Sequence, residues 1–165
     1  MPFDYETNVT MLKTLLDAHN TTTATPDLSS GLTTRVRNVF INDPEVVAIR
    51  WNDLPAVFIR IQSSEEEAAA LGPTGPSRAH KTKNADYEII GLYVKDGANS
   101  AHSAALTEIY RLAENLEGVF QQEFNLSSTA LWCHAASTNF GSFGLGEGVR
   151  VKGFLTNLKA RYHFR

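Results

Sequence analysis

Hydrophobic and polar residues alternate almost without error along residues 154–165. Side chains of an extended strand point alternately to opposite faces, so this pattern predicts a half-buried strand with one apolar and one basic face. The apolar parity comprises Phe154, Thr156, Leu158, Ala160, Tyr162 and Phe164. The other comprises Leu155, Asn157, Lys159, Arg161, His163 and Arg165. Just upstream, Val149 and Val151 use the opposite parity, which predicts a β-bulge at Gly153.

Three earlier segments also have the pattern of strands. In residues 56–62, alternate positions carry branched apolar side chains, which predicts a strand with one buried face. Residues 86–95 are apolar on both parities, as in a strand at the centre of a sheet. Residues 129–137 are predicted to form the remaining strand. The segments 71–84 and 139–148 are rich in glycine or proline and are predicted to be loops.

Two segments have the periodicity of amphipathic helices. The first begins at Asp4, a favourable N-cap, and continues to Asn20, with the apolar stripe Tyr5, Val9, Leu12, Leu15 and Leu16. The second follows a cap at Asn99 or Ser100 and ends near Phe124. Its apolar stripe comprises Leu106, Ile109, Tyr110, Ala113, Leu116, Val119 and Phe120. Residues 28–40 fit a helix and an extended segment about equally well, because Gly31 interrupts their apolar spacing.

The order of these elements predicts an α+β fold. Two strands close around a loop, a long helix crosses over, and two further strands form a hairpin, as in an antiparallel sheet with helices on one side. We therefore expect an antiparallel or mixed β-sheet of about four main strands, with an N-terminal helix and a long central helix packed on one face. No linker or repeat interrupts the 165 residues, so residues 1–165 are expected to form a single domain.

Composition places the chain among ordinary globular proteins. Charged residues make up 20%, hydrophobic residues 42%, and the net charge is −3, which excludes disordered and strongly DNA-binding classes. Cys133 is the only cysteine, so no disulfide within the chain is possible, and synthesis in a reducing cytoplasm is the simplest expectation. No apolar run approaches the roughly 20 residues that span a bilayer, so no membrane partner is expected.

No pattern in the sequence predicts an enzyme, a cofactor site or a metal site. Cys133 and His134 are adjacent on a predicted strand and point to opposite faces, where they cannot act as a nucleophile and its base. The histidines lack the i, i+4 spacing of a zinc-binding helix. The glycines between Gly141 and Gly148 lack the Lys-Ser/Thr of a phosphate loop and lead into a strand, not a helix.

Side chains on the two predicted loops indicate contact surfaces. Phe140, Phe143 and Leu145 alternate with the glycines of residues 139–148, and apolar side chains on a mobile loop are typical of a surface that becomes buried against a partner. The loop at 71–84 is longer than most connections, which is typical of function or disorder. It carries Arg78, His80, Lys81 and Lys83, for which a solvated loop is the favoured interpretation and contact with an acidic partner the alternative.

The basic face of the last strand also has two interpretations. Its basic row comprises Lys159, Arg161, His163 and Arg165, and no acid follows Glu147. We favour a solvated face or cross-strand pairing with acids such as Asp86 and Glu88, because exposed strand faces commonly carry such charges. The alternative is contact with an acidic neighbouring subunit or with passing DNA.

Three stretches, together with the order of elements, resemble the tail terminator (tail completion) proteins of long-tailed bacteriophages, the lambda tail terminator family. The first is Asn42-Asp43-Pro44 followed by LPAVFI at 54–59. The second runs from the acidic residues 65–67 through the Gly-Pro-basic loop to YEIIGLYVKD at 87–96 and into the long helix. The third is the closing valine-rich strand. In pattern, the resemblance spans most of residues 1–165.

This resemblance implies an α+β protomer that forms a hexameric ring at the head-proximal end of the tail tube. Such a ring stops tube polymerisation and joins the tail to the neck connector, and DNA passes through its lumen without sequence-specific binding. The resemblance therefore implies a structural protein of the virion, assembled in the host cytoplasm, that is not an enzyme. The alternatives are another neck component, such as a head-closure or adaptor protein, and a small α+β ligand-binding domain or enzyme with a pocket between the long helix and the sheet.

Overall fold

The computed structural model describes residues 4–41, 51–68, 81–95, 102–144 and 150–164. These residues form α1 (Tyr5–Ala18), β1 (Asn38–Ile41), η1 (Trp51–Asp53), β2 (Ala56–Ala68), β3 (Lys81–Lys95), α2 (His102–Gln122), β4 (Trp132–Gly144) and β5 (Arg150–Phe164). The strands form one sheet in the order β1-β2-β3-β5-β4. β1 and β2 are parallel, and every other neighbouring pair is antiparallel.

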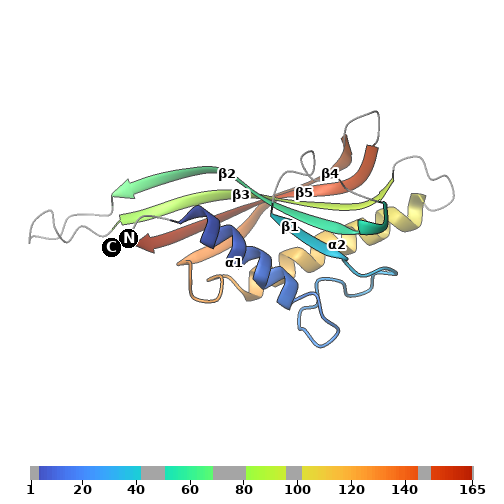
Figure 1. The fold of residues 1–165 in the computed structure, drawn as a ribbon, viewed down its shortest axis with the longest axis horizontal. Helices are drawn as coiled ribbons and strands as arrows, with labels where there is room; N and C mark the ends of the chain where they lie inside the picture. Colours follow the sequence, from blue (N-terminus) through green and yellow to red (C-terminus); the bar gives the residue numbers. More distant parts are fainter. Residues whose placement is uncertain (1–3, 42–50, 69–80, 96–101, 145–149, 165) are drawn as a thin grey trace, which may run out of the picture.

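Both helices lie under the same face of the twisted sheet (Figure 1). α1 contacts β1 and β2, whereas α2 contacts β3, β4 and β5. We call this covered side the helix face and the other side the outer face. The predicted α+β class, with both helices on one face, is confirmed. The sheet has five strands in the described ranges, against about four predicted, because the short β1 forms in the segment whose sequence favoured neither helix nor strand.

Helix α1 forms as its sequence predicts. Asp4 is the N-cap, and its carboxylate accepts a hydrogen bond from the backbone N–H of Thr7 at 3.1 Å. This bond and one from the Thr7 hydroxyl hold the pKa of Asp4 below its usual value. Four predicted apolar residues are buried, namely Val9, Leu12, Leu15 and Leu16. Tyr5 is instead 42% exposed, because it lies in the first turn beside the far end of β2.

Helix α2 buries most of its predicted stripe against the sheet. Ile109, Leu116 and Phe120 are almost completely buried, and Leu106 packs against this core at its rim. Tyr110 is a wrong prediction, since 46% of it is exposed while Leu112 is fully buried. The predicted caps at 99 and 100 lie outside the described residues.

The central strand carries a core on each face, as its sequence predicts. On the helix face, Tyr87 and Ile89 of β3 belong to the main cluster with residues of α1 and α2. On the outer face, Ile90 and Leu92 belong to a second, smaller cluster. The other members of that cluster are Leu54, Ala56, Phe58 and Val151, with Phe40, Phe143 and Leu155 packed against it.

The predicted bulge at Gly153 is wrong. Val151 faces the outer cluster and Phe154 faces the main cluster, so β5 needs no irregularity to bury both. The irregularity lies on the partner strand, where Leu92 pairs with Gly153 and Val94 pairs with Lys152, leaving Tyr93 as the extra residue. The parity change in the sequence therefore marks a change of core, not a bulge.

Three strands are longer than predicted. β2 continues through the acidic residues 65–67 to Ala68, and β3 begins at Lys81 inside the predicted long loop. β4 extends to Gly144 through residues that were predicted to form a glycine loop. Figure 1 shows β2, β3 and β5 running side by side beyond the start of α1. The extra length comes from pairing between strands, which sequence periodicity does not report.

The segment between α1 and β1 is held by a bidentate ion pair. Arg35 donates two hydrogen bonds to the carboxylate of Asp27, at 2.7 and 2.9 Å. Nearby, the Asn20 side chain donates to the carbonyl of Val36 at 2.7 Å. The Arg35 guanidinium holds the pKa of Asp27 below its usual value of 3.8.

Asp27→Asn is expected to lower the free energy of unfolding by about 1 kcal/mol at pH 7 and by less at pH 3. The carboxylate has a lower pKa folded than unfolded, so its stabilisation is present above pH 3.8 and is lost as the pH falls toward the folded pKa. Urea unfolding of both proteins at the two pH values measures this. An equal difference at pH 7 and pH 3 would show that the ion pair does not stabilise the fold.

Candidate protein-interaction site

Strand β4 is the last strand at one border of the sheet. Its partner is β5, and no other strand in the described ranges pairs with it. Its thirteen residues, WCHAASTNFGSFG, include no Asp, Glu, Lys, Arg or Pro. Proteins usually protect an edge strand with charges, prolines or bulges, because its backbone groups can pair with another chain. The one such feature here is a bulge at Ala136, where Ala135 pairs with Leu158 and Ser137 with Asn157.

Exposed large apolar side chains gather along this strand and the adjoining end of α2. The structure exposes Tyr5, Tyr110, Phe124, Leu131, Trp132 and Phe140, and all but Tyr5 lie on α2, on β4 or on the chain between them. The Tyr110 and Phe140 rings meet edge to face with centroids 4.8 Å apart, although 46% and 48% of these residues remain exposed. We call β4 and these five residues the β4 edge surface. Its apolar, uncharged character is typical of a protein contact.

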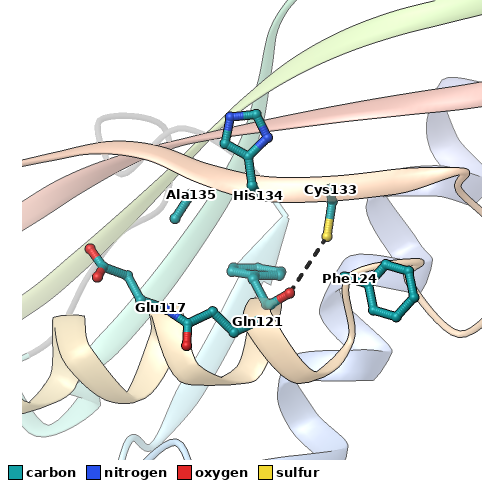
Figure 2. Close-up of a pocket in the computed structure, with 7 residues that line it drawn as sticks. Glu117, Gln121, Phe124, Cys133, His134 and Ala135 are labelled. Atoms are coloured by element: carbon teal, nitrogen blue, oxygen red, sulfur yellow. Dashed lines mark hydrogen bonds between the residues drawn. The ribbon is translucent and has the colours of Figure 1, made fainter.

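A shallow groove of about 300 Å³ lies between α2 and β4. Its lining comprises Glu117, Phe120, Gln121, Phe124, Cys133, His134 and Ala135. Figure 2 shows the Cys133 and Ala135 side chains pointing toward α2 and His134 pointing away from it. Cys133 and His134 therefore lie on opposite faces, as predicted, and cannot act on each other.

Cys133 is a buried structural thiol. Its sulfur lies 3.4 Å from the carbonyl oxygen of Glu123 and 4.0 Å from that of Phe120, the contact drawn as a dashed line in Figure 2. Burial raises the pKa of this thiol to about 12. The thiolate is the nucleophilic form of cysteine, so the group is inert at neutral pH.

The carboxylate of Glu117, also in the groove, takes part in a chain of hydrogen bonds. Glu117 on α2 accepts from the hydroxyl of Thr138 on β4 at 2.7 Å, and Thr138 contacts the hydroxyl of Thr156 on β5 at 2.9 Å. Thr156 is completely buried. This chain fixes the edge strand against α2, so the β4 edge surface is presented on a rigid support.

The structure separates the apolar residues that the sequence placed on one loop. Phe140 and Phe143 lie on β4, so their prediction as loop residues is wrong, whereas Leu145 lies outside the described residues. Phe140 points to the helix face, toward Tyr110 and Phe154. Phe143 is half-buried against the outer-face cluster. Of the two described residues, Phe140 is therefore the better contact candidate.

The basic residues predicted on the long loop are also divided. Lys81 and Lys83 belong to β3, so their prediction as loop residues is wrong, while Arg78 and His80 lie outside the described residues. The Lys83 amine donates to the hydroxyl of Tyr5 at 2.6 Å and lies 4.6 Å from the centre of the Tyr5 ring. Lys83 thus joins α1 to the sheet, and this structural role does not require contact with another protein.

The basic row of β5 lies on the outer face. Lys159 pairs in register with Asp86, so the predicted cross-strand register with Asp86 is confirmed. Lys159 and His163 are exposed. Arg161 donates to the hydroxyl of Thr82 at 3.1 Å. Arg165 lies outside the described residues. The prediction for Glu88 is wrong, because its carboxylate accepts a hydrogen bond from Arg60 of β2.

The sequence contains a signal for the β4 edge surface that periodicity misses. Between Glu123 and Glu147 there is no Asp, Glu, Lys or Arg. Such a stretch is expected either in a core or in a contact surface, and β4 is mostly exposed. Residues such as Leu131 and Trp132 become candidates only when the strand is known to be an edge.

The described residues contain neither a metal-binding cluster nor a membrane-spanning helix. Within the described ranges, no three His, Cys, Asp or Glu side chains gather into a group that could hold a metal ion. Neither helix described by the structure is long and apolar enough to cross a bilayer. In the comparisons with known proteins, no family model and no curated protein matches this chain.

Proposed function

We propose that this chain is a structural virion protein, a tail terminator that forms a homo-oligomeric ring, a hexamer in the resembled family. The ring stops polymerisation of the tail tube protein and joins the tail to the head-proximal neck protein. DNA passes through its lumen without sequence-specific binding, and no cofactor takes part. The proposal rests on the sequence resemblance and on the β4 edge surface, a contact site without catalytic character.

The observation that carries the proposal is the uncharged edge strand. A monomer with this edge would expose thirteen residues of unprotected strand beside Tyr110, Phe124 and Phe140. Covering that edge with a neighbouring copy removes the hazard of uncontrolled pairing. When one surface of each copy binds a different surface of the next, the repeated rotation between copies can close into a ring. A closed ring is suitable for capping a tube.

An enzymatic function has less support. The space between α2 and the sheet, where an active site would lie, is filled by Ile109, Leu116 and Phe120. In the groove beside it, the Cys133 thiol is protonated at neutral pH and Glu117 accepts a hydrogen bond from Thr138. The protonated thiol is not a nucleophile, and the Glu117 carboxylate is already engaged with Thr138.

Light scattering after size-exclusion chromatography tests ring formation, and electron microscopy of tube assembly tests termination. We expect a species of about six times the 18.2 kDa chain mass, alone or on tube ends. Adding the protein to polymerising subunits of the cognate tail tube is expected to shorten the tubes and cap one end. A protein that stays monomeric and leaves tube length unchanged would contradict the proposal. Binding to purified portals instead of tubes would favour the head-closure or adaptor alternative.

A further inference from the structure

The sheet has a second open border, formed by the far half of β2. In the part of the chain that the structure describes, β1 pairs with Ala56–Ile59 alone, whereas β2 continues to Ala68. From Arg60 onward β2 pairs with β3, and no described strand pairs with its other side. This stretch, residues 60–68, is called the β2 edge below. Among the described residues, the sheet thus has two borders without a further strand, one on each side.

The directions of the strands make these two borders compatible. The pairs β2–β3, β3–β5 and β5–β4 are all antiparallel, so β4 runs opposite to β2. If two copies lie side by side in the same orientation, β4 of one copy therefore meets β2 of the next as an antiparallel pair. This is the geometry that a repeated head-to-tail contact requires.

The two borders also lie at the same level of the sheet. Trp132 of β4 pairs with Arg161, which pairs with Asn84, which pairs with Glu65 of β2. Two residues along each strand, a second row of partners runs from His134 through Lys159 and Asp86 to Ser63. Lateral repetition of the sheet would place these ends opposite one another without a large shift along the strands.

The charges of the two borders are complementary. Glu65 and Glu66 are exposed on β2, and Glu65 lies on the outer face, whereas Glu66 lies on the helix face across from Lys83. β4 carries no acid, and the strand beside it exposes Lys159 and His163 on the outer face. A contact between two β4 edges would instead bring two basic rows together, and juxtaposed like charges are unfavourable.

An aromatic residue accompanies the β2 edge as well. Tyr5, the one exposed large hydrophobic residue described away from the β4 edge surface, contacts the hydroxyl of Ser64 at 2.7 Å. The apolar residues beside β4 therefore have an aromatic counterpart on the helix face of the opposite border.

We propose that the β4 edge of each copy pairs antiparallel with the β2 edge, residues 60–68, of the next copy, so that one continuous sheet runs around the ring. The occupant of the β4 edge is thus a second copy of this chain. The inference rests on the proposed ring and adds the elements that form its contacts. Attraction between the acidic β2 edge of one copy and the basic row of β5 in the next copy favours the head-to-tail order.

Crosslinking of engineered cysteines tests this pairing. His134 and Ser63 are exposed, lie on the outer face and stand at the same level of the sheet. The variant carrying both His134→Cys and Ser63→Cys is treated with a short bis-maleimide, which the buried thiol of Cys133 should resist. We expect a ladder of dimers, trimers and larger products, at least about tenfold above the product of either single variant. A variant carrying His134→Cys with Thr14→Cys is the control, since Thr14 is exposed on α1, which lies on the helix face and not on the outer face.

The outcomes separate this inference from the proposed function. Dimers from His134→Cys alone would show that two β4 edges meet, which overturns the head-to-tail pairing. A ring by light scattering without a ladder would also overturn the pairing and leave the ring intact. A monomer by light scattering would overturn both the ring and the pairing. Circular dichroism of each variant identifies any loss of fold.

Discussion

Gly153→Ala is expected to lower the free energy of unfolding by roughly 3 kcal/mol or more, or to prevent folding. A Cβ at residue 153 would lie 1.9 Å from the backbone oxygen of Gly91 and 3.0 Å from its carbonyl carbon. Both atoms belong to β3 in the centre of the sheet, so neither can move away without breaking the pairing of β3 with β5. Because β5 is central as well, the strain cannot be relieved at the rim of the fold.

A matched substitution lies directly across the β4–β5 pair. Gly141 pairs with Gly153, and a Cβ at Gly141 would meet no atom within 4 Å. Gly141→Ala is therefore expected to change the free energy of unfolding by at most about 0.5 kcal/mol. Urea unfolding followed by circular dichroism compares the two variants with the parent protein. Equal stabilities for all three would show that β3 and β5 do not approach each other this closely.

The elements predicted correctly are those whose pattern is local. The C-terminal strand is visible because alternate side chains such as Leu158 and Lys159 face a core and water, and α1 is visible because Asp4 caps an apolar stripe. Each of these patterns needs no knowledge of a distant partner. The same holds for β3, whose apolar residues on both parities indicate a core on each face.

The ends of the long strands could not be predicted, because they are held by distant residues. Residues 81–84, KTKN, have the sequence of a loop, yet they lie between β2 and β5 and take their extended form from both. Residues 139–144 read as a glycine loop, but β5 pairs with every one of them. In such places tertiary pairing overrides a weak local preference.

The candidate site follows from the same limitation. Phe140 was recognised from the sequence as a contact residue, because an aromatic side chain among glycines has no other evident role. Tyr110, which contacts Phe140, is not indicated by the sequence, because helical spacing places it in the core. Trp132, at the other end of β4, is not indicated either, because the position of its strand in the sheet is unknown from the sequence. Only the strand order identifies β4 as a border and places Phe140, Tyr110 and Trp132 along it.

Two lysines in the middle of β4 are expected to abolish assembly without unfolding the protomer. Ala136 and Ser137 are exposed, and edge lysines are the means by which natural sheets resist pairing with other chains. In Ala136→Lys with Ser137→Lys, any strand added to β4 would have to cover two ammonium groups beside the basic row of β5. We expect the dissociation constant of the oligomer to rise at least about 100-fold. The mass distribution of the two proteins over a range of concentrations measures this change.

The control changes the same two positions to neutral residues. Ala136→Thr with Ser137→Thr introduces β-branched neutral residues, which suit a strand, and should assemble like the parent protein. If the lysine variant is monomeric and the threonine variant assembles, the loss is due to charge on the β4 edge and not to damage to the strand. If the lysine variant assembles as well as the parent, β4 is not in the contact between copies. The ring, if present, would then have to be built from another surface, because lysines on an edge strand oppose pairing with a further strand.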